Sequence, residues 1–426
     1  MKFKSWTAGI AVLTLATAPV FAEDGLAQWS YDQMVAPVGC CDGGCDSGCD
    51  CGDGCGCGSA CGGGGLFSGI GPGWLEGFSL AGTLGIDALD VGGWTQFGYT
   101  DEATMLGAPP FNGAPINGSS FNNIKDRLNL HQQYFYVGRE ADGSNGFDLG
   151  FRADFMYGID GQDTQSFGNP ANSFDNGGDF NHGIYGWAIP QLYGEVAMGD
   201  LSVKVGHFYT LVGYEVIPAP NNFFFSHSLT MYNSEPFTHT GVLGTYSGYE
   251  NMTLYGGWTL GWDTGFDQSL QGNSFLGGFS VGLTDNVTVT YINTYGNFGL
   301  RSGGQNDSYS HSIVADVTLT NSVNYVLQTD MVSIDDLNGT LLNNDQVGIN
   351  QYLFYEWNDI VTFGSRIEWW KSDGVSYCEY TSGANIKLLD NMILRPEYRT
   401  DWSPGSLVAG ASYDETIVGC DCILTY

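Results

Sequence analysis

The feature that most constrains this chain is a residue-by-residue alternation that begins near residue 92 and continues to the C-terminus. In residues 147–157, apolar side chains occupy every second position, and Asp148, Arg152 and Asp154 fall between them. A period of two is typical of a β-strand with two unlike faces, and no long window keeps the helical period of 3.6 residues. The pattern therefore predicts an all-β fold.

The alternation divides into sixteen candidate strands of about 8 to 11 residues, the length that crosses a bilayer as a tilted strand. They are expected near 92–99, 128–138, 147–157, 189–198, 201–209, 239–248, 252–262, 274–284, 287–297, 309–319, 323–333, 346–356, 360–370, 378–388, 392–402 and 416–426. A soluble β-sandwich also keeps charges off one face, but domains of that class are smaller.

Seventeen charged residues lie inside these strands, and all of them fall on the face opposite the apolar one. In a barrel this face points inward. The candidate pore-lining residues are Asp148, Arg152, Asp154, Glu195, Lys204, Asp316, Asp330, Glu356, Arg366, Glu368, Arg395, Glu397, Arg399 and Asp401, and Glu379, Lys387 and Asp421 complete the set.

The connections alternate between short turns, such as Gly199-Asp200 and Asp285-Asn286, and long loops. An even number of strands with this alternation is typical of a transmembrane, antiparallel, up-and-down β-barrel in the outer membrane, with both chain ends in the periplasm. The last strand alternates and ends at Tyr426, which resembles the signal read by barrel-assembly machinery. Girdles of aromatic residues at the membrane interfaces are expected from Trp94, Trp258, Trp262, Trp357, Trp369 and Trp402.

The N-terminus predicts export. Lys2 and Lys4 precede an apolar stretch at 6–18, and Val20-Phe21-Ala22 precedes a cleavage site, so residues 1–22 form the expected signal peptide. Residues 23–74 are expected to be a flexible, disordered periplasmic segment, and 75–426 the barrel. This segment carries eight cysteines, for which disulfides, including links to neighbouring molecules, and metal binding are both open: Cys40, Cys41, Cys45, Cys49, Cys51, Cys55, Cys57 and Cys61.

Five stretches resemble the outer-membrane beta-barrel porin family described as OmpL-like. They are residues 128–139, GSNGFDLGFRADFMYGIDGQDTQ at 143–165, PFTHTGVL at 236–243, YGGWTLGWDTGFDQ at 255–268 and RPEYRTDW at 395–402. The resemblance spans about residues 80–426 and leaves out the cysteine segment. It implies a porin-like barrel and no particular solute.

The charge balance indicates which solutes such a barrel favours. The chain has 46 acidic and 13 basic residues, which disfavours nucleic acid as a partner. The inward charges comprise eleven acidic and six basic residues, and the long loops hold eighteen acidic and four basic ones. A negative vestibule concentrates cations, so a porin for passive diffusion of small hydrophilic solutes, with cation preference, is expected. The alternative is a secreted or surface β-rich protein that binds carbohydrate or has a structural role.

The long loop 210–238 is unusually apolar, and it has three possible placements. It folds into the lumen as a constriction, packs on a neighbouring protomer of a homotrimer, or contacts lipid. The lumen placement buries the apolar residues and brings the charged residues and histidines near the narrowest point. The candidate constriction residues are Glu215, Phe223, Phe224, Phe225, His227, Glu235 and His239.

Two readings remain for the four inward arginines, Arg152, Arg366, Arg395 and Arg399. They form a basic ladder across the pore, or they brace the wall through salt bridges with Asp154, Glu368, Glu397 and Asp401, and the second reading is favoured.

An enzyme is not expected, because the histidines are scattered and no G-x-S-x-G stretch appears. No cofactor is expected either, apart from Ca²⁺ or another divalent cation at the acidic loop residues Asp160, Asp163, Asp175 and Asp179.

Overall fold

The computed structural model describes residues 89–103, 121–334, 345–372, 374–403 and 413–426. The expected signal peptide, the flexible segment and its eight cysteines lie outside the described residues. Three cysteines, Cys378, Cys420 and Cys422, lie within them, and all three are free thiols.

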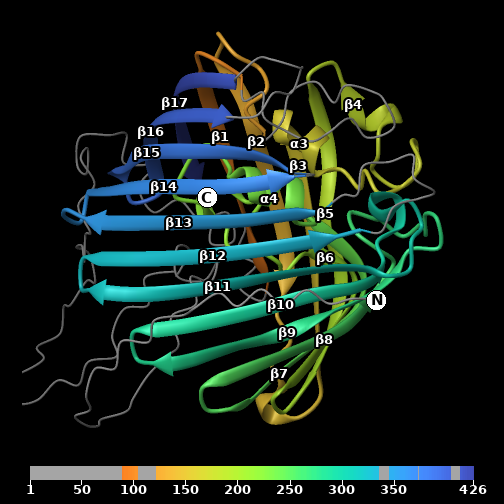
Figure 1. Ribbon diagram of the computed structural model, residues 1–426. Helices are drawn as coiled ribbons and strands as arrows, with labels where there is room; N and C mark the ends of the chain where they lie inside the picture. The colour runs from red at the N-terminus through yellow and green to blue at the C-terminus, as the bar shows by residue number, and fades with distance from the viewer. Residues whose placement is uncertain (1–88, 104–120, 335–344, 373, 404–412) are drawn as a thin grey trace, which may run out of the picture.

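The molecule is a closed barrel of sixteen antiparallel strands, and this confirms the predicted fold class (Figure 1). Each strand pairs with the next along the chain, and β1 pairs with both β2 and β17, which closes the ring. The strands are β1 (Asp90–Thr100), β2 (Asn129–Arg139), β3 (Asp148–Gly158), β5 (Tyr185–Met198), β6 (Leu201–Tyr209), β7 (Thr238–Tyr249), β8 (Met252–Thr259), β9 (Asn273–Thr284), β10 (Val287–Asn297), β11 (Ser308–Thr320), β12 (Val323–Ser333), β13 (Gln346–Glu356), β14 (Val361–Ser372), β15 (Val375–Leu389), β16 (Met392–Ser403) and β17 (Tyr413–Thr425).

In the part of the chain that the structure describes, helical structure lies in the connections between strands. Two short α-helices, α3 (Ile159–Thr164) and α4 (Leu229–Ser234), lie in long loops, and the two-residue strand β4 (Asn181–His182) pairs with β5. Single 3-10 turns occur at Gly143–Asn145, Gly178–Phe180, Ala219–Asn221 and Gly299–Ser302. Among the described residues, no helix has both the length and the apolar character needed to cross a bilayer.

The short turns explain how neighbouring strands are joined so tightly. Gly199, in the turn between β5 and β6, has a φ of 59°, in the left-handed region that tight hairpins require and glycine adopts without steric cost. Several predicted strand ends differ from the observed ones, such as the start of β5, which lies at Tyr185 and not at residue 189. The predicted end of β8 is wrong as well, since the strand stops at Thr259 and not at residue 262. The reason is Gly261, whose φ of 113° turns the chain away from the ladder.

The two faces of the wall differ as the alternation predicts. Apolar side chains on the outward face are exposed, among them Phe135, Phe155, Leu327, Leu353 and Tyr398. On the inward face, charged side chains are buried, among them Asp330, Arg366, Glu379, Arg399 and Asp421. The barrel therefore has an apolar outer band and a polar interior, as a wall between lipid and water requires.

Two of the six tryptophans expected in the interfacial girdles are placed differently. Trp94 is buried inside the barrel, where its ring stacks on Tyr134 at 3.8 Å between centroids and its Nε1 donates to Gln132. Trp262 is buried against Phe298 at 4.5 Å. The girdle prediction is wrong for these two, because position near a strand end does not fix which face a side chain takes. Trp258, Trp357, Trp369 and Trp402 are exposed.

Candidate pore and the segment inside it

The connection between β6 and β7, residues 210–237, lies inside the barrel and is called the inner segment below. It contains α4, which packs on β12, β13 and β14, and Figure 1 shows α4 within the ring of strands. Most of its side chains are buried. The apolar residues that made this loop unusual in sequence are thus removed from water by the barrel wall.

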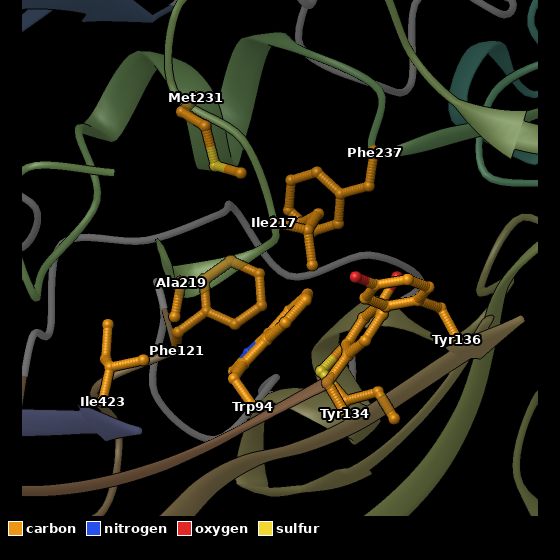
Figure 2. Packing of buried hydrophobic residues seen from close by; sticks show 10 residues of the cluster. Trp94, Phe121, Tyr134, Tyr136, Ile217, Ala219, Met231, Phe237 and Ile423 are labelled. Carbon is orange, nitrogen blue, oxygen red and sulfur yellow. The ribbon is translucent and has the colours of Figure 1, made fainter. Parts of the chain in front are cut away.

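Four apolar residues spread along the inner segment belong to a buried cluster at the closure of the barrel (Figure 2). Ile217, Ala219, Met231 and Phe237 of the segment meet inward-facing residues of β1, β2, β3 and β17. The wall residues of this cluster are Trp94, Tyr134, Tyr136, Met156 and Ile423, and Phe121 joins them from the loop before β2.

Carboxylates of the wall hold the segment by accepting its backbone N–H groups. Glu368 Oε2 accepts from Leu229 N at 2.6 Å, and its Oε1 accepts from Thr230 N at 2.6 Å. Glu397 Oε2 accepts from Ser226 N at 3.1 Å. The two Glu368 contacts satisfy donors at the start of α4 that have no partner within the helix.

Arginines of the wall hold the segment by donating to its carbonyl groups. Arg395 donates to the carbonyls of Ala219 and Asn222, at 3.0 and 2.6 Å. Arg399 donates to the carbonyl of His227 at 2.6 Å. Guanidinium groups suit this task, because each offers several N–H donors in a fixed plane.

Arg366 is the centre of the attachment. Its guanidinium is fully buried and lies 2.6 Å from Glu215 of the segment and 2.8 Å from Glu379 of β15. Burial alone would raise the pKa of Glu215, but Arg366, His227 and the N–H group of Ser228 together outweigh burial and hold that pKa below its ordinary value. Glu215 stays ionised and also accepts from Ser228 N.

The four arginines therefore make salt bridges with wall or segment carboxylates, which is the bracing that the sequence favoured over a ladder. Arg152 pairs with Asp154 and Asp90, and Arg399 pairs with Asp401. Two partners differ from expectation. Arg366 pairs with Glu215 and Glu379, and Arg395 pairs with Asp421, while Glu368 and Glu397 bind the inner segment.

A cavity of about 1000 Å³ lies on the short-turn side of the inner segment. The residues that line it include the turn residues Asn358, Asp359 and Asp390, so it reaches the short-turn end of the barrel. Of the fourteen candidate pore-lining residues, six line this cavity: Arg152, Asp154, Glu195, Lys204, Asp316 and Glu356.

The other candidates are inward but are not in the lining of the cavity. Asp330, Arg366, Glu368, Arg395, Glu397, Arg399 and Asp401 are all buried, most of them in direct contact with the inner segment. Asp148 forms an ion pair with Arg139 near a short turn. Strand parity predicts the inward face correctly for these residues, but it does not say whether that face meets water or folded chain.

Three of the candidate constriction residues line the cavity, namely Glu215, Phe223 and Glu235. Phe224 and Phe225 pack against the wall, and His227 is buried beside Phe121. His239 differs from expectation, since it belongs to β7 and contacts Thr210 and the Gly261 carbonyl away from the cavity.

Glu235 packs directly against Gly213 within the inner segment, a contact that the sequence did not predict. Gly213 has a φ of 92°, and a Cβ at this position would fall 1.9 Å from Glu235 Oε2. Only glycine fits there. Burial and the neighbouring charge of Asp330 raise the pKa of Glu235 well above its ordinary value, and Gln328 donates to both carboxylates. Gly213 itself, a glycine between two apolar stretches, was the signal in the sequence for this contact.

Two of the four acidic loop residues considered for a divalent cation, Asp160 and Asp175, have structural partners. Asp160 contacts His131 and Gln132, and Asp175 accepts from the backbone N–H groups of Ser166 and Ile189. Within the described part of the chain, no group of three or more His, Cys, Asp or Glu side chains is arranged to hold a metal ion.

The chain was compared with solved structures and with curated proteins. The outer membrane channel DcaP of Acinetobacter baumannii has 9% identity and a TM-score of 0.52, with 79% of this chain and 97% of that chain covered. OmpT of Vibrio cholerae has 12% identity and a TM-score of 0.47, with 79% and 99% covered. A mutant of Rh. blastica porin has 14% identity and a TM-score of 0.45, with 79% and 100% covered. The comparison with curated proteins returned no match.

At these identities the likeness to DcaP shows a shared fold and nothing finer. The family is shown by a family model, described as Putative beta-barrel porin-2, OmpL-like, which matches residues 88–424. This confirms the resemblance seen in the sequence, and with it the outer-membrane location of a barrel whose family and fold are those of channels. The chain belongs to the Putative beta-barrel porin-2, OmpL-like family.

Proposed function

We propose that this protein is a diffusion pore for small hydrophilic solutes that favours cations, with the inner segment as its constriction. The observation that carries the proposal is the charge of the cavity lining, which comprises ten acidic and four basic residues. A cavity wall of one sign, bounded by protein of low dielectric constant, raises the local concentration of counter-ions.

The basic residues of the lining are largely neutralised. Arg152 pairs with Asp90 and Asp154, Arg139 pairs with Asp148, and Lys387 pairs with Asp390. Asp316 and Glu356, in contrast, form no salt bridge within the described residues. The excess negative charge is therefore carried by groups without a basic partner, which supports cation preference.

The orientation and assembly follow from the same proposal. The short turns and both chain ends face the periplasm, and the long loops face outward. Residues 1–22 are a signal peptide, residues 23–74 a periplasmic segment whose cysteines link neighbouring molecules or bind metal, and the last strand is read by barrel-assembly machinery. A homotrimer stays a prediction, checked by the mass of the detergent-solubilised particle.

The reversal potential across a planar bilayer under a KCl gradient tests the ion preference. The proposal predicts a potential whose sign corresponds to K⁺ passing more readily than Cl⁻. A potential of the opposite sign would reject it.

A further inference from the structure

The cavity has an aromatic wall at the point where the inner segment meets β13. Phe223 of the segment packs against Phe354 at 4.8 Å between ring centroids, and Tyr214 lies 6.5 Å from the same ring. All three residues line the cavity. Their surfaces give the cavity an apolar side that a pore for hydrated inorganic ions alone does not need.

Carboxylates without basic partners line the same cavity. Glu356 follows Phe354 by two residues on β13 and therefore shares its inward face. Asp316 of β11 is close enough to Tyr214 for its charge to add to the burial that raises the pKa of that phenol. Both carboxylates are in the lining, and neither forms a salt bridge within the described residues.

Two basic side chains of the lining, Arg152 and Lys204, occupy another part of it, and Lys387 of β15 is paired with Asp390. Arg152 lies on β3 with its guanidinium over the ring of Tyr136, and Lys204 lies on β6 with its ammonium over the ring of Tyr193. The cavity thus presents aromatic surface and carboxylates without basic partners at β11 and β13. The cationic side chains on β3 and β6 already have aromatic or acidic neighbours.

We propose that this cavity binds organic cations that carry an apolar or aromatic body, and that such solutes are a preferred cargo of the pore. Their ammonium group lies near Asp316 and Glu356, and their body packs on Tyr214, Phe223 and Phe354. Aromatic faces attract cations directly and also bury hydrocarbon. A volume of about 1000 Å³ accommodates a solute of this kind. The inference rests on the proposed function, because it names the class of cation that the pore prefers.

The test uses the purified full-length protein in a planar bilayer and four probes that separate charge from aromatic character. Benzyltrimethylammonium carries both, tetramethylammonium carries only the charge, benzyl alcohol only the ring, and benzenesulfonate the ring with opposite charge. We expect benzyltrimethylammonium to block the K⁺ current at a concentration several-fold below that of tetramethylammonium, because its ring adds apolar burial and aromatic contact with Tyr214, Phe223 and Phe354. Benzyl alcohol and benzenesulfonate should not block the K⁺ current at that concentration.

Matched variants assign the effect to the cavity. Asp316→Asn and Glu356→Gln should each weaken the block several-fold, and Phe354→Leu should weaken it while keeping the site apolar. Asp285→Asn removes the same charge from a turn outside the cavity lining and should leave the block unchanged. Equal block by the two ammonium probes, or an equal effect of Asp285→Asn and Asp316→Asn, would overturn the inference.

The two proposals fail separately. A K⁺-selective pore that does not discriminate among the probes keeps the proposed function and overturns this inference. A pore that favours Cl⁻ overturns the proposed function. Calorimetric titration of the detergent-solubilised protein with benzyltrimethylammonium measures the binding without any current, and absence of heat at concentrations that saturate the block would also overturn the inference.

Discussion

At the scale of single residues, Arg366 does most to hold the inner segment in place. Its guanidinium binds Glu215 and the Ser226 carbonyl on the segment, and Glu379 on β15. All of these groups are buried. A buried charge network of this kind is costly to disturb, because removal of one member leaves the others without compensation.

We therefore predict that Arg366→Met lowers the free energy of unfolding by about 3–5 kcal/mol, because Glu215 and Glu379 lose their cation. The temperature at which the folded band disappears on an unheated-versus-heated gel measures the loss. Arg139→Met is the matched control, since its pair with Asp148 is partly exposed and such pairs contribute about 1 kcal/mol or less. Equal shifts for the two variants would contradict the account.

A second residue-scale prediction concerns pH. Asp263 Oδ1 accepts from the backbone N–H groups of Phe237 and Thr238, where the inner segment joins β7. Burial raises the pKa of Asp263 from 3.8 to about 7. The connection between β8 and β9, residues 260–272, therefore holds this proton more tightly when it is packed in the barrel than when it is open. Protonation stabilises the packed form fully below about pH 4, and this stabilisation is lost as the pH rises to about 7.

The fluctuations in ion current that arise when loop 260–272 opens should therefore be greater at pH 8 than at pH 5. Asp263→Asn keeps an oxygen acceptor but does not titrate, so it should reduce this difference. Asp267→Asn, in the same loop but exposed, is the control. A difference that Asp263→Asn leaves unchanged would show that another group is responsible.

The residue scale also marks the limit of sequence reasoning. Parity predicted that Arg366, Glu368 and Arg399 point inward, because alternation and charge are local properties of a strand. It did not predict that these side chains bind backbone groups of residues 226–230, since that depends on the path of a loop far away in sequence. The positions predicted for Trp94 and Trp262 were wrong for a related reason, because both side chains pack inside the barrel on residues that are distant in sequence.

At the scale of elements, the existence of the strands and the face that each residue takes were accessible from the sequence. All sixteen expected strands are present, and β10, β12 and β13 have the expected bounds. The pattern succeeds because lipid on one side and polar interior on the other impose opposite requirements on successive residues. It fails at β8, where a glycine conformation and not hydrophobicity ends the strand.

The two faces of the strands give an element-scale prediction. Leu327, near the middle of β12, points outward, and Leu327→Arg should destabilise the barrel by about 2–4 kcal/mol because the charge enters lipid. Thr290, on β10, lines the cavity, and Thr290→Arg should have a much smaller effect. Urea-induced unfolding in lipid vesicles compares the two variants. A larger loss for Thr290→Arg would reverse the assignment of the faces.

At the scale of the whole molecule, the negative charge of the chain has a location. It is largely absent from the outward face of the described strands, apart from Asp414 near the start of β17, and is concentrated in the cavity and the long loops. Long-range fields of this kind are screened by salt, with a Debye length of about 10 Å at 0.1 M and about 3 Å at 1 M.

The preference for K⁺ over Cl⁻ should therefore decrease as ionic strength rises. Reversal potentials under the same concentration ratio of KCl, centred near 0.1 M and near 1 M, give the two permeability ratios. A ratio that does not change would mean that short-range binding, and not the field of the cavity, sets the selectivity.

The central claim is that the inner segment narrows an otherwise open sixteen-stranded pore. Single-channel conductance of the wild-type protein and of a variant lacking residues 219–234 tests it most directly, with heat-modifiable migration used to select folded protein. Since the deletion removes α4 and the stretch attached to β14 and β16, the account predicts a clearly larger conductance for the variant. A folded variant with unchanged conductance would contradict it.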